Sequence, residues 1–239
     1  MQVLILRLES PLMSFGDVIV DQLGRTSEFP GLSLLTGLLA NALGYEHGET
    51  EKIQALQDTI QIGVRRVRLG TRLTDYQTVD FSQDFLPVKG WTTHGKLDER
   101  KGGQATKEGT HIRYRDYWTN ASFFVAVTIN SKTLSIEQLK EACQFPARPL
   151  FIGRKHCLPS IPIFYTILDS PSIQDALKDI VLPNIPMDQS HPIWYPSLES
   201  NSADASIGYT YDLRNWKEGI HSGRRLIKKE YIPYTKIQD

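Results

Sequence analysis

Side chains able to carry proton-transfer or metal chemistry are few and widely spaced in this sequence. No two of its six histidines lie four residues apart, and it contains no HExxH motif, so the sequence does not indicate a metal centre. It also lacks GxxxxGKS/T, GxGxxG and GxSxG, which are typical of phosphate loops, dinucleotide sites and nucleophile elbows. We therefore expect no bound metal or cofactor.

The nearest approach to a catalytic cluster is formed by Lys107, His111 and Tyr114. A metal-independent ribonuclease needs one group that takes the proton of the 2′-hydroxyl and another that stabilises the charged phosphorane. These three side chains could fill both roles. They equally suit a basic arm that grips phosphate groups, and we favour this second interpretation.

The segment FPARPLFIGRKHC, residues 145–157, favours nucleic-acid binding more strongly. It combines Arg148, Arg154 and Lys155 with Phe151 and Gly153. Glycine lets backbone amides approach a phosphate, and the basic side chains neutralise it. Aromatic and guanidinium planes can stack on bases. The alternative is a buried turn that carries surface bases.

The distribution of charge agrees with a basic face on a neutral body. The formal net charge is zero, from 27 basic and 27 acidic residues, which argues against a free-standing nucleic-acid binder. Residues 65–115, however, hold eleven Lys and Arg against six acids, and residues 214–229 hold six against one, so each segment has a balance of +5. Such segregation suggests a local anion-binding surface, although solvated loops would give the same counts.

The overall composition is that of a globular protein. Hydrophobic residues make up 40% and charged residues 23% of the 239, enough for a core without metal or disulfide support. Cys143 and Cys157 show no metal-binding spacing and suit a reducing compartment. The apolar run before Arg7 is too short for a signal peptide or a membrane span, so we expect a cytoplasmic protein with no membrane association.

Local patterns predict alternating strands and helices that could position these residues. In chain order they are a strand at 3–9, a helix opened by Ser33 as N-cap and stopped near Gly44, a helix at 51–58, a strand at 60–69, a strand at 121–129, a helix capped by Ser135, and a strand at 161–168. This order, with insertions, is the βαββαβ pattern of ferredoxin-like, RRM-like α+β folds. The fold alone indicates little about function.

Two regions depart from this pattern. Residues 75–115 are predicted to form a long hairpin insertion, within which residues 95–109 have too few apolar side chains to bury a core face. We expect 95–109 to be mobile in the free chain and ordered by a partner. Residues 170–239 are rich in proline and are predicted to be an irregular part of the same single domain, 1–239, in which RRLIKKEYIPY could return as a strand.

Five separated segments resemble one protein family. They are LILRLESPLMSFG (4–16), RTSEFPGLSLLTGLLANALG (25–44), TDYQTV (74–79), RYRDYWTNASFFVAV (113–127) and RPLFIGRKHCLPSIPIF (148–164). Together they are similar to the CasD-type subunits of the type I-E CRISPR Cascade complex, within the RAMP group of RNA-binding proteins. The resemblance covers residues 1–168 in the same order.

The resemblance implies a ferredoxin-like body with a thumb at 75–115 and a role in holding the 5′ handle of the guide RNA. It implies as partners the guide RNA, the repeating backbone subunit and the large PAM-reading subunit, with target DNA reached only through the complex. The matching positions implied as RNA-binding are Leu12, Met13, Ser14, Phe15, Gly16, Arg25, Ser33, Tyr76, Arg113, Arg115, Arg148, Arg154, Lys155 and His156. For Arg25 and Ser33, the expectation rests on free amides at a helix N-terminus.

Three hypotheses follow from the sequence. The first is a non-catalytic RNA-binding subunit that caps the backbone of the complex. The second is a metal-independent endoribonuclease, because a related type I-C subunit cleaves RNA with Tyr, Lys and His, a set that Tyr45, Lys107 and His111 loosely resemble. The third is a ferredoxin-like interaction domain with no RNA role. We favour the first.

Overall fold

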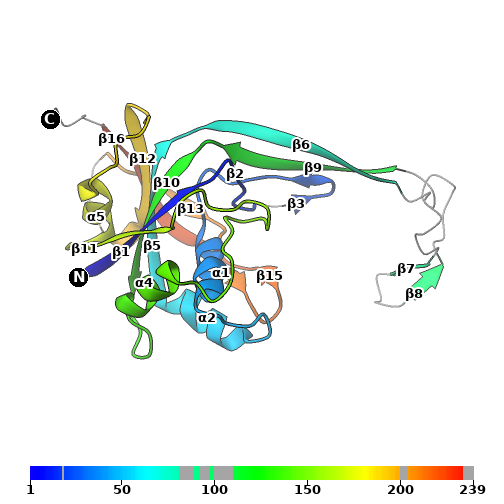
Figure 1. The fold of residues 1–239 in the computed structure, drawn as a ribbon, viewed down its shortest axis with the longest axis horizontal. Coiled ribbons are helices and arrows are strands. Elements are labelled where there is room, and N and C mark those ends of the chain that lie inside the picture. Colours follow the sequence, from blue (N-terminus) through cyan, green and yellow to red (C-terminus); the bar gives the residue numbers. More distant parts are fainter. Residues whose placement is uncertain (18, 81–88, 92–96, 100–109, 200–203, 234–239) are drawn as a thin grey trace.

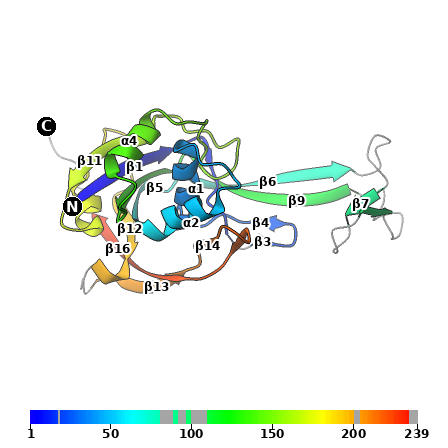
Figure 2. The same ribbon diagram turned by 90° about the horizontal axis from the view of Figure 1, so that it is seen from below.

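The computed structural model describes residues 1–17, 19–80, 89–91, 97–99, 110–199 and 204–233. These residues form a body built on one large sheet, from which a two-stranded hairpin projects (Figure 1). The second view shows the same projection, with helices gathered on the body (Figure 2). Most of residues 95–109, for which mobility is expected, lie outside the described residues.

The main sheet has seven strands in the order β11-β1-β10-β5-β12-β16-β13. All its neighbouring strands run antiparallel to each other. The strands are β1 (Gln2–Glu9), β5 (Ile60–Arg68), β10 (Ser122–Ile129), β11 (Phe164–Asp169), β12 (Ser190–Pro196), β13 (Ser206–Thr210) and β16 (Arg225–Pro233).

Strand β1, which lies between β11 and β10, is apolar along most of its length because both of its faces are covered. Leu4 and Leu6 face the larger core, which is closed by α1 (Leu32–Ala42), α2 (Thr50–Thr59) and α4 (Ile136–Gln144). Val3 and Ile5 face a smaller core under α5 (Ile173–Asp179) on the opposite side. Alternation between two buried faces explains the near-continuous run VLIL.

The local capping signals agree with the structure in one helix and differ in another. Ser135 is the N-cap of α4 and forms a full capping box with Gln138. Gly44 has a φ of +82° just beyond α1, as expected of a helix stop. The N-cap of α1, however, is Gly31 and not Ser33. The prediction for Ser33 is therefore wrong by two residues.

The projecting hairpin, here called the hairpin arm, consists of β6 (Thr71–Asp80) and β9 (Thr110–Thr119). On its other edge β9 pairs with β2 (Leu12–Met13) and, in parallel, with β4 (Leu23–Gly24), which pairs with β3 (Ile19–Val20). Two short strands, β7 (Lys89–Trp91) and β8 (Leu97–Glu99), form a separate pair (Figure 1). The described strands of the arm begin at 71 and end at 119, slightly wider than the predicted 75–115.

The described residues after 170 are more regular than expected. Strands β12, β13 and β16 extend the main sheet, and β14 (Arg214–Asn215) pairs with β15 (Ile220–His221). A single 3₁₀ turn, η1, spans Ser197–Glu199. Pro192 and Pro196 are tolerated because β12 meets β5 over only Ile193 and Trp194, between them. The expectation of an irregular region is therefore wrong for this part, while the predicted return of RRLIKKEYIPY as a strand is confirmed through Pro233.

A buried polar network lies between β5, β12 and α5. Arg65 donates hydrogen bonds to Nδ1 of His191 and to the carbonyl oxygen of Leu177. Arg65 is 4% exposed and His191 is fully buried. The network links the centre of the sheet to the strands contributed by the C-terminal third.

The coarse class prediction is confirmed, because the chain is a mixed α and β structure dominated by sheet. Both cysteines are free and buried. Among the described residues, no helix has the length and apolar character needed to cross a membrane.

Candidate nucleic-acid interface

Two loops from distant parts of the chain pack together at the base of the hairpin arm. Gly153 has a φ of +94°, and a Cβ atom placed on it would lie 1.6 Å from the carbonyl oxygen of Ser14. The Ser14 amide donates to the carbonyl oxygen of Ile152 at 3.3 Å. Only glycine permits this approach, so Gly153 fixes the loop of residues 150–157 against the loop of residues 12–16.

Two guanidinium groups, Arg115 from β9 and Arg154 from the 150–157 loop, meet over Gly24 of β4. Nη1 of Arg115 lies 2.6 Å, and Nη2 of Arg154 3.2 Å, from the point that a Cβ on Gly24 would occupy. Arg154 also donates to the carbonyl oxygens of Gly24 and Asp116 and lies 4.5 Å from the centre of the Tyr117 ring. We call Arg115 and Arg154 the arginine pair.

The hairpin arm presents two different faces. Arg113, Arg115 and Tyr117 alternate along β9 and therefore share one face, here called the arginine face. The His156 ring lies 5.3 Å from Tyr117, which brings it to this face as well. Asp75 is directly opposite Arg115 in the register, and its carboxylate accepts a hydrogen bond from Gln77.

The opposite face of the arm, here called the tyrosine face, carries Tyr76 and Tyr114, whose ring centres are 5.5 Å apart. Beside them is a hollow of about 390 Å³, lined in part by Arg25, Arg72 and Asp116. Burial would raise the pKa of Asp116, but hydrogen bonds from Thr74 and Arg72 and the charge of Arg25 lower it overall. Asp116 thus stays ionised between the two arginines.

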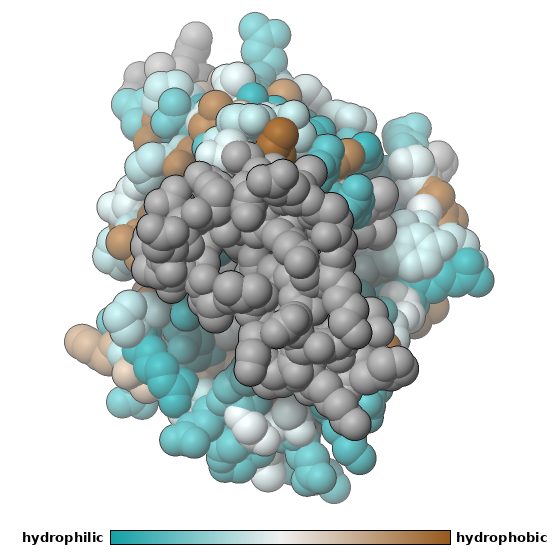
Figure 3. Space-filling model, turned by 90° about the vertical axis from the view of Figure 1, so that its right-hand side faces the viewer, coloured by the Kyte–Doolittle hydropathy of each residue, from teal (hydrophilic) through white to brown (hydrophobic). Residues whose placement is uncertain are grey.

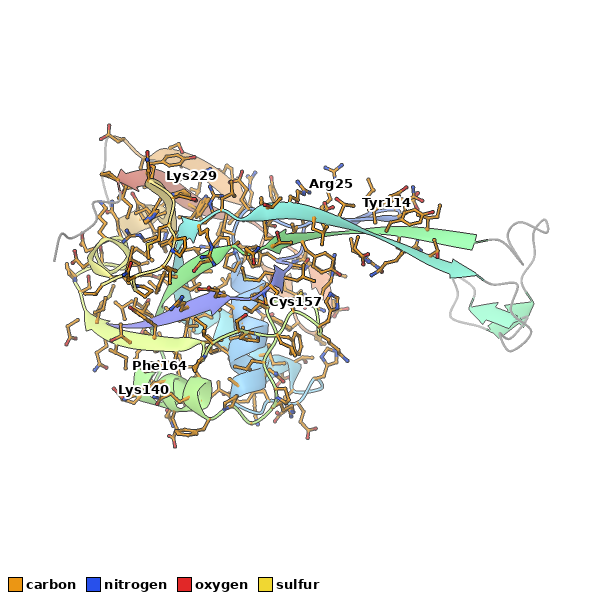
Figure 4. All side chains as sticks on the ribbon, turned by 45° about the horizontal axis from the view of Figure 1, so that its top comes forward. Arg25, Tyr114, Lys140, Cys157, Phe164 and Lys229 are labelled. Atoms are coloured by element: carbon orange, nitrogen blue, oxygen red, sulfur yellow. The ribbon has the colours of Figure 1, made fainter. Side chains whose placement is uncertain are left out.

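The surface around the arm is mainly hydrophilic. Viewed from the arm's free end, the coloured residues are mostly teal or pale, with scattered brown apolar side chains (Figure 3). Arg25 and Tyr114 both project along the upper side of the arm in the stick view (Figure 4). A polar, charged ligand suits this surface better than an apolar one.

Comparison with known proteins identifies the family. The family described as "CRISPR-associated protein (Cas_Cas5)" matches residues 3–227. The chain belongs to the Cas5 family. Subunit CasD of the Cascade CRISPR system from Escherichia coli (strain K12) is 29% identical over 184 residues, which is 73% of this chain and 75% of CasD. The resemblance to CasD-type subunits of type I-E is thereby confirmed.

Solved structures show the same fold. A chain of a "CRISPR RNA-guided surveillance complex" superposes with a TM-score of 0.67 at 21% identity, covering 97% of this chain and 89% of that one. A structure described as "Crystal structure of Cas protein" gives a TM-score of 0.62 at 23% identity, covering 97% and 95%. At these identities the likeness extends to the fold alone.

Several residues that the sequence singles out serve packing in this Cas5 chain. Met13 and Phe15 are buried, and Phe15 packs edge-on against Phe123 in the core. Ser14 is also buried and donates to the carbonyl oxygen of Asp116. Leu12 is half-buried, whereas Gly16 is exposed with open space around it. Of this loop, only Gly16 offers an open approach to a ligand.

Arg148 and Ser33 lie away from the arginine pair. Arg148 donates to the carbonyl oxygens of Gly44 and Tyr45 beyond the end of α1. The amides of Leu32 and Ser33 bond to Asp212, one to its carboxylate and one to its carbonyl oxygen. The Leu32 and Ser33 amides are therefore already bonded within the chain and are not available to a phosphate.

The remaining predicted residues are either exposed or lie outside the residues that the structure describes. Arg25, Tyr76, Arg113, Lys155 and His156 are all exposed. Of the proposed catalytic cluster, Lys107 lies outside the described residues, and for His111 only the backbone, within β9, is described. Within the described part of the chain, no group of three His, Cys, Asp or Glu side chains could hold a metal ion.

Sequence reasoning missed Arg72, Asp116 and Tyr117 as parts of the site. Tyr117 could have been found, because it follows Arg113 and Arg115 at the same period of two. Arg72 and Asp116 could not have been paired without the register that makes β6 and β9 neighbours.

Proposed function

We propose that the chain is a non-catalytic RNA-binding subunit of a type I-E CRISPR surveillance complex, in which it holds the 5′ handle of the guide RNA and caps the backbone. The observation that carries this proposal is the arginine pair, which brings two guanidinium groups together over Gly24. CasD, a subunit of Cascade, and the chain from an RNA-guided surveillance complex support it as relatives.

The arginine pair is suited to a phosphate group. Two adjacent cations repel each other, and a bound oxyanion replaces that repulsion with charge-assisted hydrogen bonds. Arg154 is oriented by two carbonyl oxygens and the Tyr117 ring, so little side-chain freedom remains to be given up on binding. Arg113 and Lys155, both exposed, could extend the binding surface to neighbouring phosphates.

The architecture supports the finer parts of the proposal. The chain order β1, α1 and α2, β5, β10, α4, β11 and the spatial order β11-β1-β10-β5 are those of a ferredoxin-like module within a single domain, 1–239. The hairpin arm corresponds to the proposed thumb. The partners would be the guide RNA, the repeating backbone subunit and the large PAM-reading subunit, in the cytoplasm.

The test uses the assembled complex, because a chain with zero net charge should bind RNA weakly alone. Complexes carrying Arg115→Gln with Arg154→Gln are compared with a control carrying Lys132→Gln with Lys217→Gln, which removes two exposed cations elsewhere. We expect less guide RNA per complex for every spacer. In a plot of the logarithm of RNA affinity against the logarithm of salt concentration, the slope should become less steep by about 0.7 for each phosphate that is no longer bound. Equal guide content and salt dependence in both complexes would refute the proposal.

A separate assay tests the absence of catalysis. The purified complex is incubated with labelled repeat RNA in EDTA, with and without the change His111→Ala. We expect guide processing to be the same in both. Loss of cleavage in the variant, with assembly intact, would make the chain an endoribonuclease.

A further inference from the structure

A second group of cations surrounds Trp194, on the body rather than on the arginine face. Trp194 is 3% exposed and stacks on Phe29, with ring centres 4.8 Å apart. Cζ of Arg66 lies 5.6 Å from the centre of the Trp194 ring, and Nζ of Lys229 lies 5.2 Å from it. We call these four residues the tryptophan cluster. The buried ring fixes the positions of both cations.

Arg66 is unusual among the described arginines in this part of the sheet. Its Nε atom is enclosed and has no hydrogen-bond partner among the described residues. Burial lowers the pKa of Arg66, and the more distant charges of Glu28 and Asp188 only partly oppose that effect. The enclosed Nε is not itself open to a ligand, but an oxyanion beside the guanidinium would offset part of the cost of its desolvation.

An exposed aromatic ring adjoins the two cations. Tyr231 is 61% exposed, and Nζ of Lys229 lies 5.6 Å from its ring centre. Lys229 and Tyr231 are two residues apart on β16 and therefore share a face. Lys229 also forms an ion pair with Glu28, whose side chain is 62% exposed and can turn towards solvent. Cations interleaved with an open aromatic ring are typical of single-strand nucleic-acid surfaces.

The tryptophan cluster is connected to the hairpin arm by a short segment. Arg25 follows β4, Ser27 accepts a hydrogen bond from the indole nitrogen of Trp118, and Glu28 then reaches Lys229. In the stick view, Lys229, Arg25 and Tyr114 follow one another along the upper side, from the body to the arm (Figure 4). The cluster therefore continues the tyrosine face and not the arginine face.

We propose that Arg66, Lys229 and Tyr231 form a second binding site for the sugar–phosphate chain of a single-stranded nucleic acid. Arg66 and Lys229 hold one or two phosphates, and Tyr231 stacks on a base. This site goes beyond the proposed function, because it lies on other strands and does not require that the handle bind at the arginine pair. An acidic peptide would also meet the two cations, but it would leave the exposed Tyr231 ring without a planar partner.

The test measures fluorescence anisotropy of the full chain with labelled single strands of about ten nucleotides, oligouridine and oligothymidine, at low salt. Arg66→Gln with Lys229→Gln is compared with Lys132→Gln with Lys217→Gln. We expect affinity to fall about tenfold, as for the removal of hydrogen bonds to charged groups. The salt slope should fall by about 0.7 if one phosphate is no longer bound and by about 1.4 if two are lost. Tyr231→Ala should weaken binding about fivefold or more with the slope unchanged.

The two probes distinguish the source of the phosphates. If the variant binds both oligouridine and oligothymidine more weakly than the control does, the site accepts any single strand. If it binds only oligouridine more weakly, the site is specific for RNA. Unchanged affinity and slope in the Arg66→Gln and Lys229→Gln variant would overturn the inference, as would displacement of the probe by oligoglutamate of equal charge. Thermal melting checks folding. If Arg66→Gln unfolds, the single changes Lys229→Gln and Tyr231→Ala carry the same test, since Tyr231 is exposed and the Lys229 side chain is 29% exposed.

Failure of this inference can be separated from failure of the proposed function. If only Arg115→Gln with Arg154→Gln weakens binding, the second site is absent and the proposed function stands. If only Arg66→Gln with Lys229→Gln weakens it, the second site stands and the arginine pair does not bind RNA. Combined reductions in affinity when all four changes are joined would support both sites.

Discussion

Replacing Asp212 should destabilise the whole domain, because this one side chain joins three parts of the chain. Its Oδ2 accepts the Leu32 amide at the start of α1, and its two carboxylate oxygens bind Arg225 of β16 at 2.8 and 2.7 Å. Asp212 is 9% exposed, so water cannot readily replace these bonds. Asp212→Ala should therefore leave an amide and a guanidinium unsatisfied together.

The expected loss of stability follows from those bonds. Removing a helix cap costs about 1 kcal/mol, and stranding the partner of a buried ion pair costs about 3–5 kcal/mol. Because the side chain of Arg225 keeps 18% exposure, the second figure is an upper bound, and we expect about 2–4 kcal/mol in all. Asp212→Asn keeps an acceptor for Leu32 and should lose only about 1–2 kcal/mol.

Urea unfolding followed by circular dichroism measures these differences. A double-mutant cycle with Arg225→Ala isolates the ion pair, since Arg225→Ala in the Asp212→Ala background should cost little more. A decrease under about 0.5 kcal/mol for Asp212→Ala would show that neither α1 nor Arg225 depends on this residue, contrary to the reasoning from its hydrogen bonds.

Three further predictions concern the body. Burial, and then the charge of Arg65, lower the pKa of His191 to about 4, below its usual 6.5. The stabilisation from neutral His191 should therefore be complete above pH 6.5 and be lost as the pH falls through 4, by at most about 3 kcal/mol; urea titrations of His191→Gln should lack this pH dependence. Burial raises the pKa of Cys143 to about 12, so iodoacetamide should label it only as fast as the chain unfolds, and rapid labelling of native protein would contradict this. Ser135→Ala should cost about 1 kcal/mol in thermal or urea unfolding by removing the capping box of α4, and no change would mean that the box is not formed in solution.

The elements that could be predicted are those whose signal is local. The run VLIL and the strand around Phe123 and Phe124 are apolar on both faces, and Ser135 stands three residues before Gln138. Residues close together in the sequence are therefore enough to predict these strands and this helix cap. The prediction of Ser33 as N-cap was wrong because the first amide of α1, that of Leu32, is bonded to the side chain of Asp212. Asp212 lies far along the chain, so no local sequence pattern includes it.

Among the C-terminal strands, β16 was predicted, but β12 and β13 could not be, for a related reason. Every residue of β13 except Thr210 is exposed, so the strand shows no buried alternation. In β12, Pro192 and Pro196 flank the two residues that meet β5. Such strands exist only through their neighbours, and their neighbours are fixed by topology rather than by sequence spacing.

The candidate site was partly predictable in the same sense. The alternation of Arg113 and Arg115 places both on one face of β9 from sequence alone. That Arg154 joins Arg115, whereas the equally basic Arg148 turns to the carbonyl oxygens of Gly44 and Tyr45, depends on how the 150–157 loop is held by Gly153. Charge indicates which residues could bind an anion, and packing decides which of them are brought together.

The late arrival of β12 affects the chain during its synthesis. Ile193 follows its partner Arg65 by 128 residues, which a ribosome adds in roughly 6–26 s at about 5–20 residues per second. Over that interval β5 can pair with β10 on one side, while its other edge awaits a partner from its own chain. An unpaired edge of this kind invites other nascent chains to add to it. Efficient production of the protein should therefore depend on keeping neighbouring nascent chains apart until the last quarter of the sequence has emerged.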